Sequence, residues 1–148
     1  MLSHFDKKNK KINFVSLCLH RGKFKMKQFE NNQIRMVIED GILYATYKAG
    51  LKMTIDDAKN IVNERLKILE GKSLPVLIID SGVVSMDKSA RDFLSSDEGI
   101  LGLKAAAIIE NSLFSKMLIN FFLRLTNPKI QVKAFSNQDD ALNWLKSL

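Results

Sequence analysis

The sequence has few of the side chains on which catalysis and covalent cross-linking depend. It contains one cysteine, Cys18, which cannot form a disulfide within the chain or build a cysteine zinc site. Its two histidines, His4 and His20, both precede the regular pattern of the chain, so neither is well placed for a buried triad or metal cage. Glycine-rich phosphate loops and a nucleophile elbow are absent too. We therefore expect no enzyme, no metal and no cofactor, and the lone cysteine favours a reducing compartment, the cytoplasm.

Long hydrophobic runs are also missing. The most apolar stretch, "SLFSKMLINFFLRL", is interrupted by Lys116 and Arg124 and falls short of the roughly 18 apolar residues that span a bilayer. A shorter run, "INFVSLCL", resembles the core of a signal peptide, but the basic "HRGKFKMK" follows where small residues and a cleavage site would be needed. The sequence therefore predicts neither a membrane span nor a secretory signal.

Charge is distributed unevenly along the 148 residues. The chain carries a formal +7, and residues 1–27 hold eight basic side chains against Asp6, so the rest of the chain is neutral. We expect residues 1–32 to be a basic arm and residues 33–148 to be one folded domain, because that length can bury a complete core. Any attraction to nucleic acid would belong to the arm, and solvated lysine-rich termini are more common, so nucleic acid is an unlikely partner.

The pattern of the domain becomes regular at residue 33. "QIRMVIED" and "ILYATYKA" flank Asp40-Gly41, a dipeptide typical of a two-residue hairpin turn. Thr54 and Asp57 form a capping-box pattern that opens a helix with an apolar stripe, which ends at Gly71. "PVLIID" is a continuous apolar run, as expected for a strand that is covered on both faces.

Helices and strands alternate through the rest of the chain. The pattern predicts a helix over 87–96, a strand at "LKAAAIIE", a helix over 112–126, a strand at "IQVKAF", and a last helix with Ser136 as N-cap. We therefore predict the α/β class, with a mixed sheet of about five strands and four helices in the order β-β-α-β-α-β-α-β-α.

Short polar residues follow the predicted parallel strands, at the edge where ligands of such sheets usually bind. They include Asp80-Ser81-Gly82 and Glu110-Asn111-Ser112. Helix caps and turns require the same residue types, so capping is the preferred interpretation.

The stretch "VLIIDSGVVSMDKSARDFL", with the order of elements, resembles the STAS family of sulfate-transporter and anti-anti-sigma-factor domains, and more closely its bacterial branch with a sporulation anti-anti-sigma-like fold. The family motif is Met-Asp-Ser-Ser-Gly-Leu-Gly, and its second serine is phosphorylated by a partner kinase. Met86 and Asp87 match this motif, and Ser89 falls on the phosphorylated position. Both glycines are replaced, by Ala90 and Asp92, and this departure weakens the expectation of a switch.

The resemblance implies a switch loop that includes Asp80, Ser81, Asp87 and Arg91 beside Ser89. Arg91 could pair with a phosphate there, or equally with an aspartate of its own helix. The function implied by the resemblance is a non-catalytic regulatory or protein-interaction domain that is switched by phosphorylation and has a protein partner.

The alternative function is binding of a hydrophobic ligand or lipid. The helix over 112–126 is apolar on nearly every side, and a stripe of Phe114, Leu118, Phe121 and Leu125 can pack on the sheet. The remaining side chains, Leu113, Met117 and Phe122, would then face a ligand or a second copy of the chain. We expect a homodimer, and we expect Phe122→Asp to give a folded monomer.

Overall fold

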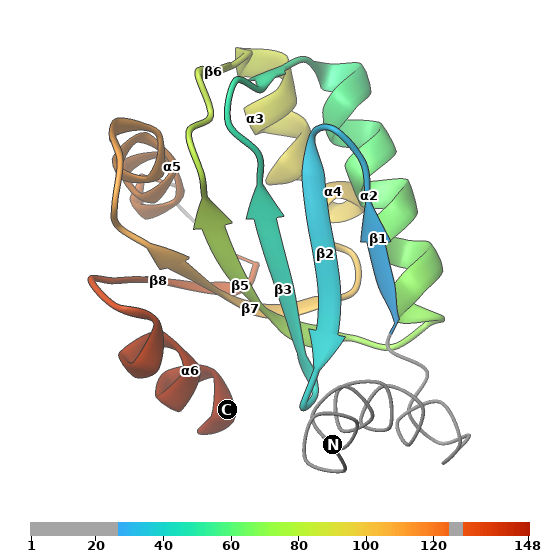
Figure 1. The fold of residues 1–148 in the computed structure, drawn as a ribbon, viewed down its shortest axis with the longest axis vertical. Helices are drawn as coiled ribbons and strands as arrows, with labels where there is room; N and C mark the ends of the chain where they lie inside the picture. Colours follow the sequence, from blue (N-terminus) through green and yellow to red (C-terminus); the bar gives the residue numbers. More distant parts are fainter. Residues whose placement is uncertain (1–26, 125–128) are drawn as a thin grey trace, which may run out of the picture.

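The computed structural model describes residues 27–124 and 129–148. Expectations for the basic arm up to residue 26, which contains Cys18 and both histidines, and for Leu125 lie outside the described residues. The prediction of an α/β fold with a mixed sheet is confirmed (Figure 1).

Six strands form the main sheet, in the spatial order β1-β2-β3-β5-β7-β8. Their bounds are β1 (Gln28–Glu30), β2 (Ile34–Glu39), β3 (Ile42–Tyr47), β5 (Leu74–Asp80), β7 (Leu103–Ile109) and β8 (Gln131–Phe135). The pairs from β1 to β3 are antiparallel, and the pairs from β3 to β8 are parallel. Two short strands, β4 (Lys52–Met53) and β6 (Ser85–Met86), form a separate parallel pair.

The hairpin between β2 and β3 follows from its turn residues. Asp40 and Gly41 have φ of 50° and 76°, the left-handed conformation that a type I′ turn requires at both central positions. The turn pairs Glu39 with Ile42 and Met36 with Ala45, which places the apolar side chains of both strands on one face. The predicted hairpin is therefore confirmed.

Five helices are described: α2 (Ile55–Leu69), α3 (Lys88–Leu94), α4 (Asp97–Ile100), α5 (Leu113–Leu123) and α6 (Gln138–Lys146). The capping box of α2 is present as predicted, because the Thr54 hydroxyl accepts from the Asp57 N–H and the Asp57 carboxylate accepts from the Thr54 N–H. The Thr54 N–H bond is also the main reason that the pKa of Asp57 is lowered. Helix α6 departs from the prediction, since its N-cap is Asn137 and not Ser136, and the Asn137 side chain accepts from the Asp140 N–H at 2.9 Å.

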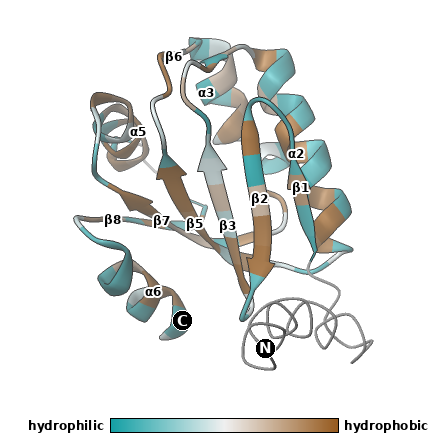
Figure 2. Ribbon diagram, viewed as in Figure 1, coloured by the Kyte–Doolittle hydropathy of each residue, from teal (hydrophilic) through white to brown (hydrophobic). Residues whose placement is uncertain are grey.

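The two faces of the sheet are covered unequally. On one face α2, α3 and α5 pack on the larger core through Ala58, Ile61, Ala90 and Leu118, among others. On the other face α6 is the helix that covers the smaller core among the described residues, through Ala141 and Leu145. The ribbon coloured by hydropathy agrees, since β5 is hydrophobic and α2 alternates hydrophobic and hydrophilic residues (Figure 2). The arrangement leaves the ends of β5 and β7 beside α3 and α5.

Strand β1 begins the sheet before residue 33, where the sequence pattern places the start of the domain. Phe29 packs against the larger core, and the Lys27 carbonyl accepts from the Ile38 N–H at 2.9 Å. The sequence signal was weak because a three-residue strand with one apolar side chain carries no periodicity.

Removal of residues 1–26 is expected to leave the melting temperature nearly unchanged, because the whole described sheet and both cores lie beyond these residues. Removal of residues 1–32 should lower it clearly, since β1 and the packing of Phe29 are then lost. Thermal unfolding of the two truncated chains checks this. A large loss already in the shorter truncation would show that the arm is part of the fold.

Candidate functional site

Asp80 organises the carboxyl end of the central strand β5. Its side chain is buried, with a residue exposure of 6%. One carboxylate oxygen accepts from the Gly82 N–H at 2.8 Å and from the Val83 N–H at 2.7 Å. Gly82 has φ of 129°, a conformation that side chains rarely adopt, so glycine permits this turn. The carboxylate therefore fixes the direction in which the chain leaves the sheet.

The same carboxylate also holds the loop that follows β7. The Ser112 hydroxyl donates to the second oxygen of Asp80, and the Asn111 amide donates to the Asp80 carbonyl at 3.3 Å. The buried Ser115 hydroxyl accepts from the Asn111 and Ser112 N–H groups at 3.1 and 3.0 Å. A carboxylate that accepts from several donors is held in one position, so these contacts join the two loop ends into one rigid unit. In this unit Asp80 is a structural hub.

Residues 81–89 follow Asp80, and most of their side chains are exposed, although Val83 and Met86 are buried in the larger core. Ser81, Ser85 and Ser89 are all exposed, and Val84 retains 60% of its accessible surface. Asp87 is the N-cap residue of α3 but its side chain makes no capping hydrogen bond, while its N–H donates to the Met53 carbonyl at 3.0 Å. Ser89 follows in the first turn of α3, and its hydroxyl faces solvent. Ser81 lies in a bend and Ser89 in the first turn of α3, as predicted, whereas Ser85, predicted in a turn, lies in the short strand β6.

Arg91 makes contacts other than those expected. Its guanidinium donates to the Met86 carbonyl at 3.1 Å, lies 3.8 Å from the Met117 sulfur, and sits 6.0 Å from the centre of the Phe121 ring. Pairing with Asp87 or Asp92, one of the two alternatives from the sequence, is not observed among the described residues, and Lys88 forms an ion pair of 2.7 Å with Asp92. Arg91 therefore ties α3 to α5.

The apolar side chains of helix α5 are not confined to one face of the helix. Phe114 and Leu118 are buried, as predicted, and Phe121 is half-buried. Met117 and Phe122, expected to face away from the core, are half-buried and pack against it, because the helix lies at the β7–β8 side of the sheet. Leu113 and Leu123 are the exposed apolar residues of the helix, at 87% and 71%.

The substitution Phe122→Asp is therefore expected to destabilise the domain by about 2 kcal/mol, and a fully folded monomer is no longer the expected product. The reason is that a charged side chain would replace apolar contacts with the core. Denaturant unfolding measures the loss, and Leu123→Asp serves as the control on the same helix, because Leu123 is exposed. Equal stability of both variants would place Phe122 outside the core.

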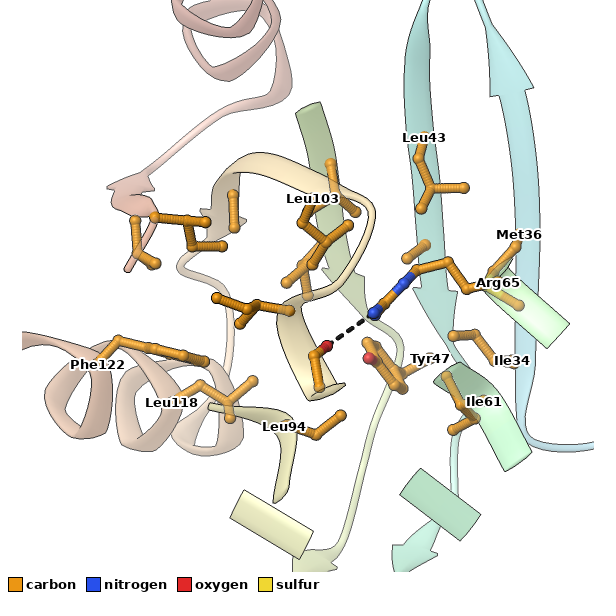
Figure 3. A pocket seen from close by; sticks show the side chains of 18 of the residues that line it. Ile34, Met36, Leu43, Tyr47, Ile61, Arg65, Leu94, Leu103, Leu118 and Phe122 are labelled. Carbon is orange, nitrogen blue, oxygen red and sulfur yellow. Dashed lines mark hydrogen bonds between the residues drawn. The ribbon is translucent and has the colours of Figure 1, made fainter. Parts of the chain in front are cut away.

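A cavity lies beneath the helices on the larger core. Its volume is about 60 Å³, and apolar side chains from the sheet, α2, α3 and α5 line it (Figure 3). Arg65 of α2 enters it, although this residue is only 7% exposed. Sequence reasoning missed Arg65. The available signal was its position on the buried stripe of α2, three residues after Val62 and four before Leu69.

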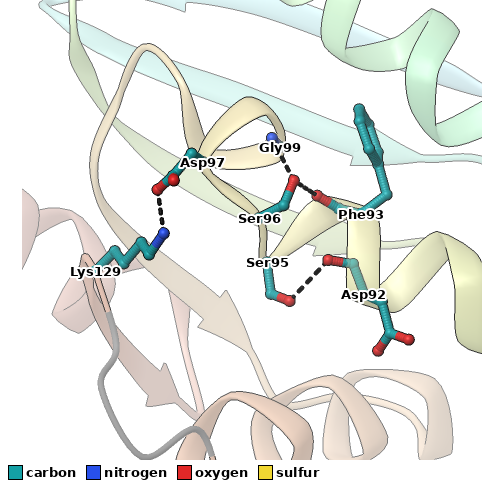
Figure 4. A network of polar contacts seen from close by, with 7 residues as sticks. All are labelled: Asp92, Phe93, Ser95, Ser96, Asp97, Gly99 and Lys129. Carbon is teal, nitrogen blue, oxygen red and sulfur yellow. Dashed lines mark hydrogen bonds and ion pairs between the residues drawn. The ribbon is translucent and has the colours of Figure 1, made fainter.

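The short helix α4 supplies the polar contacts of Arg65. The Ser96 hydroxyl caps this turn, since it accepts from the Gly99 N–H at 3.2 Å and donates to the Phe93 carbonyl at 2.5 Å (Figure 4). Lys129 forms an ion pair with Asp97 across the same turn. The carbonyls of Gly99 and Leu101 then accept from the Arg65 guanidinium at 2.7 and 3.0 Å.

Among residues 27–124 and 129–148 there is no cluster of three or more histidine, cysteine, aspartate or glutamate side chains that could hold a metal ion. Within the same part of the chain, each helix is too short or too polar to cross a bilayer.

Comparison with known proteins places this fold. A solved structure of an uncharacterised DUF3478-family protein with a SpoIIAA-like fold, from Shewanella loihica PV-4, aligns with a TM-score of 0.52 and 20% identity over 79% of this chain and 97% of that chain. This likeness confirms the STAS-like fold that the sequence suggested. No curated protein matches the chain. Residues 36–148 match the family described as "Domain of unknown function (DUF7793)", and the chain belongs to that family.

Proposed function

We propose that the domain is a non-catalytic regulatory module that binds a protein partner at the carboxyl end of its central strand. The binding surface consists of Val84, Lys88, Ser89 and Leu113, here called the β5-end surface. All four residues are exposed, and Val84 and Leu113 are large apolar side chains at 60% and 87% exposure. Exposed apolar side chains with polar neighbours are typical of protein interaction sites.

The observation that carries this proposal is that one residue, Asp80, holds both loops of the β5-end surface in place. Asp80 accepts from the N–H of Val83, next to Val84, and from the hydroxyl of Ser112, next to Leu113. One buried carboxylate thus brings the two exposed apolar residues to the same end of the sheet. Arg91 links α3 to Met117, one turn beyond Leu113, so α3 and its Ser89 belong to the same region. A surface held in place before binding loses less entropy when a partner docks.

Ser89 is the proposed control point of this surface. It is exposed, and in the resembled family the matching serine is phosphorylated. A phosphate would add about −1.5 to −2 charges beside Lys88 and close to the Lys88–Asp92 ion pair. That charge would alter the match to a partner without disturbing the core, because Ser89 is exposed.

Substitution at Ser89 is expected to affect binding more than folding. Ser89→Ala should change the free energy of unfolding by less than about 1 kcal/mol, since an exposed residue in a first helical turn contributes little. Ser89→Asp should be equally stable and should weaken or strengthen partner binding. Denaturant unfolding tests the first part. Peptide mass spectra of protein isolated from its own cells test whether Ser89 is phosphorylated, and repeated absence of phosphate at Ser89 under several growth conditions would remove the switch.

A second copy of the chain is one candidate partner, as the sequence analysis expected. Exposed Leu113 would then contact the other copy, so native mass spectrometry of the full chain should show dimers that Leu113→Asp abolishes. If the parent chain is monomeric, the partner of the β5-end surface is a different protein.

Hydrophobic-ligand binding is the second candidate function, and the cavity beside Phe122 and Leu118 favours it. Pockets for drug-sized ligands measure roughly 300–1,000 Å³. At about 60 Å³ the cavity is too small for a lipid chain, so its ligand must be small.

A further inference from the structure

The cavity beneath the helices combines an apolar wall with a single charged side chain. Its lining includes Ile34 and Met36 from β2 and Leu118 and Phe122 from α5, and Figure 3 shows these side chains around a central space. Arg65 is the one charged residue that lines it in the described part of the chain, and it extends from α2 into this space. An apolar cavity with one cation has the composition of a site for a small amphiphilic anion.

The hydrogen bonding of Arg65 is incomplete. One terminal nitrogen donates to the carbonyls of Gly99 and Leu101, but the Nε–H has no partner within residues 27–124 and 129–148. No carboxylate of those residues forms an ion pair with the guanidinium either. Neutral carbonyls satisfy donors but supply no countercharge. The guanidinium therefore retains an open donor and an uncompensated charge.

Burial makes this arrangement costly without an anion. A buried cation loses its hydration, and an ion pair with good hydrogen bonds offsets that loss. The pKa of Arg65 is lowered by this desolvation. A water molecule could accept the Nε–H bond, but it would leave the charge uncompensated. A carboxylate would accept the bond and also supply the countercharge.

Tyr47 provides a second donor on the same wall. It is 8% exposed and lines the cavity together with Arg65. Its burial raises the pKa of its hydroxyl, so the phenol stays protonated at neutral pH and can donate. A carboxylate with its two oxygens can accept from both residues.

We propose that this cavity binds a monocarboxylate of one or two carbon atoms, formate or acetate, whose carboxylate accepts from the Arg65 Nε–H; the methyl group of acetate would contact Leu118. The size follows from comparison with a cavity of about 150 Å³, which accommodates the six heavy atoms of benzene, because about 60 Å³ holds correspondingly fewer heavy atoms, and formate has three and acetate four. This inference goes beyond the proposed function, since the cavity is distinct from the β5-end surface.

The test is titration of the full ¹⁵N-labelled chain with acetate, followed through the Nε–H resonance of Arg65. Acetamide is the matched neutral probe, and nitrate is the anion that lacks an alkyl part. We expect a saturable shift with acetate, with a dissociation constant on the order of millimolar, and much weaker responses to the other two. Absence of a saturable shift would mean that water alone occupies the cavity. Equal responses to all three probes would also overturn the proposal.

Three variants test whether the ligand binds in the cavity beside Arg65. Arg65→Met retains most of the side-chain volume and should weaken acetate binding by at least about tenfold. Lys67→Met removes a cation from the exposed face of the same helix and should leave binding unchanged. Ala106→Leu fills the cavity, retains Arg65 and should also abolish binding, which gives an answer even where Arg65→Met folds poorly. Acetate binding that survives Ala106→Leu in a folded protein would place the ligand elsewhere.

Discussion

Replacing Asp80 with alanine is expected to lower the free energy of unfolding by about 3 to 5 kcal/mol. The substitution removes the acceptor of the Gly82 and Val83 N–H groups and of the Ser112 hydroxyl. Each hydrogen bond to a charged group is worth roughly 1.5–3 kcal/mol, and donors that remain buried without a partner add to the loss. Denaturant unfolding measures the difference.

The matched control for this prediction is Asp92→Ala. Asp92 is exposed and forms one surface ion pair with Lys88, so its removal should cost less than about 1 kcal/mol. Asp80→Asn should fall between the two, since the amide retains one oxygen acceptor. If Asp80→Ala proves no more costly than Asp92→Ala, then Asp80 does not hold the two loops together.

Gly99→Ala is expected to cause a loss of similar size, about 3 to 5 kcal/mol. A Cβ atom at this position would lie 2.0 Å from the Phe93 carbonyl oxygen and 2.6 Å from the Leu94 backbone. Backbone atoms cannot move aside as a flexible side chain can, so α4 would have to shift. The shift would also displace the Gly99 carbonyl that accepts from Arg65. Thermal and denaturant unfolding test the loss.

Gly71→Ala is the control that separates the cost of steric crowding from the cost of the backbone conformation. Gly71 has φ of 79°, but a Cβ atom there would have no neighbour within 4 Å. Its replacement should therefore cost about 1–2 kcal/mol, the ordinary cost of the left-handed conformation. Equal effects of the two substitutions would show that the close approach at Gly99 is relieved by small movements.

The fold was predictable where local residues determine local structure. Asp40-Gly41 specifies the hairpin, and Thr54 with Asp57 specifies the start of α2. Elements that span little more than one period of their pattern were missed, such as the three-residue β1 and the four-residue α4. Capping at the start of α6 was misplaced by one residue, because Ser136 and Asn137 are both good N-caps and only the observed hydrogen bond distinguishes them.

The site was less predictable because its contacts join distant segments. Asp80 and Ser112 are 32 residues apart, and their hydrogen bond depends on the pairing of β5 with β7. Sequence spacing identified both as cap or turn residues but could not place them together. The burial of Arg65 was not predicted for a different reason. A charged residue on an apolar stripe is expected to extend to solvent, whereas hydrogen bonds to the carbonyls of Gly99 and Leu101 hold the Arg65 guanidinium in the interior.

The central claim is that the β5-end surface binds a protein partner, and co-purification from the native cells tests it most directly. The parent chain, a Val84→Asp/Leu113→Asp double variant and a Leu123→Asp control would be isolated at equal expression, and bound proteins would be identified by mass spectrometry. All three replaced leucine or valine residues are exposed, so each variant should fold. The account predicts one partner, or a second copy of the chain, with the parent and the control, and its loss from the double variant. Retention of that partner by a folded double variant would contradict the account.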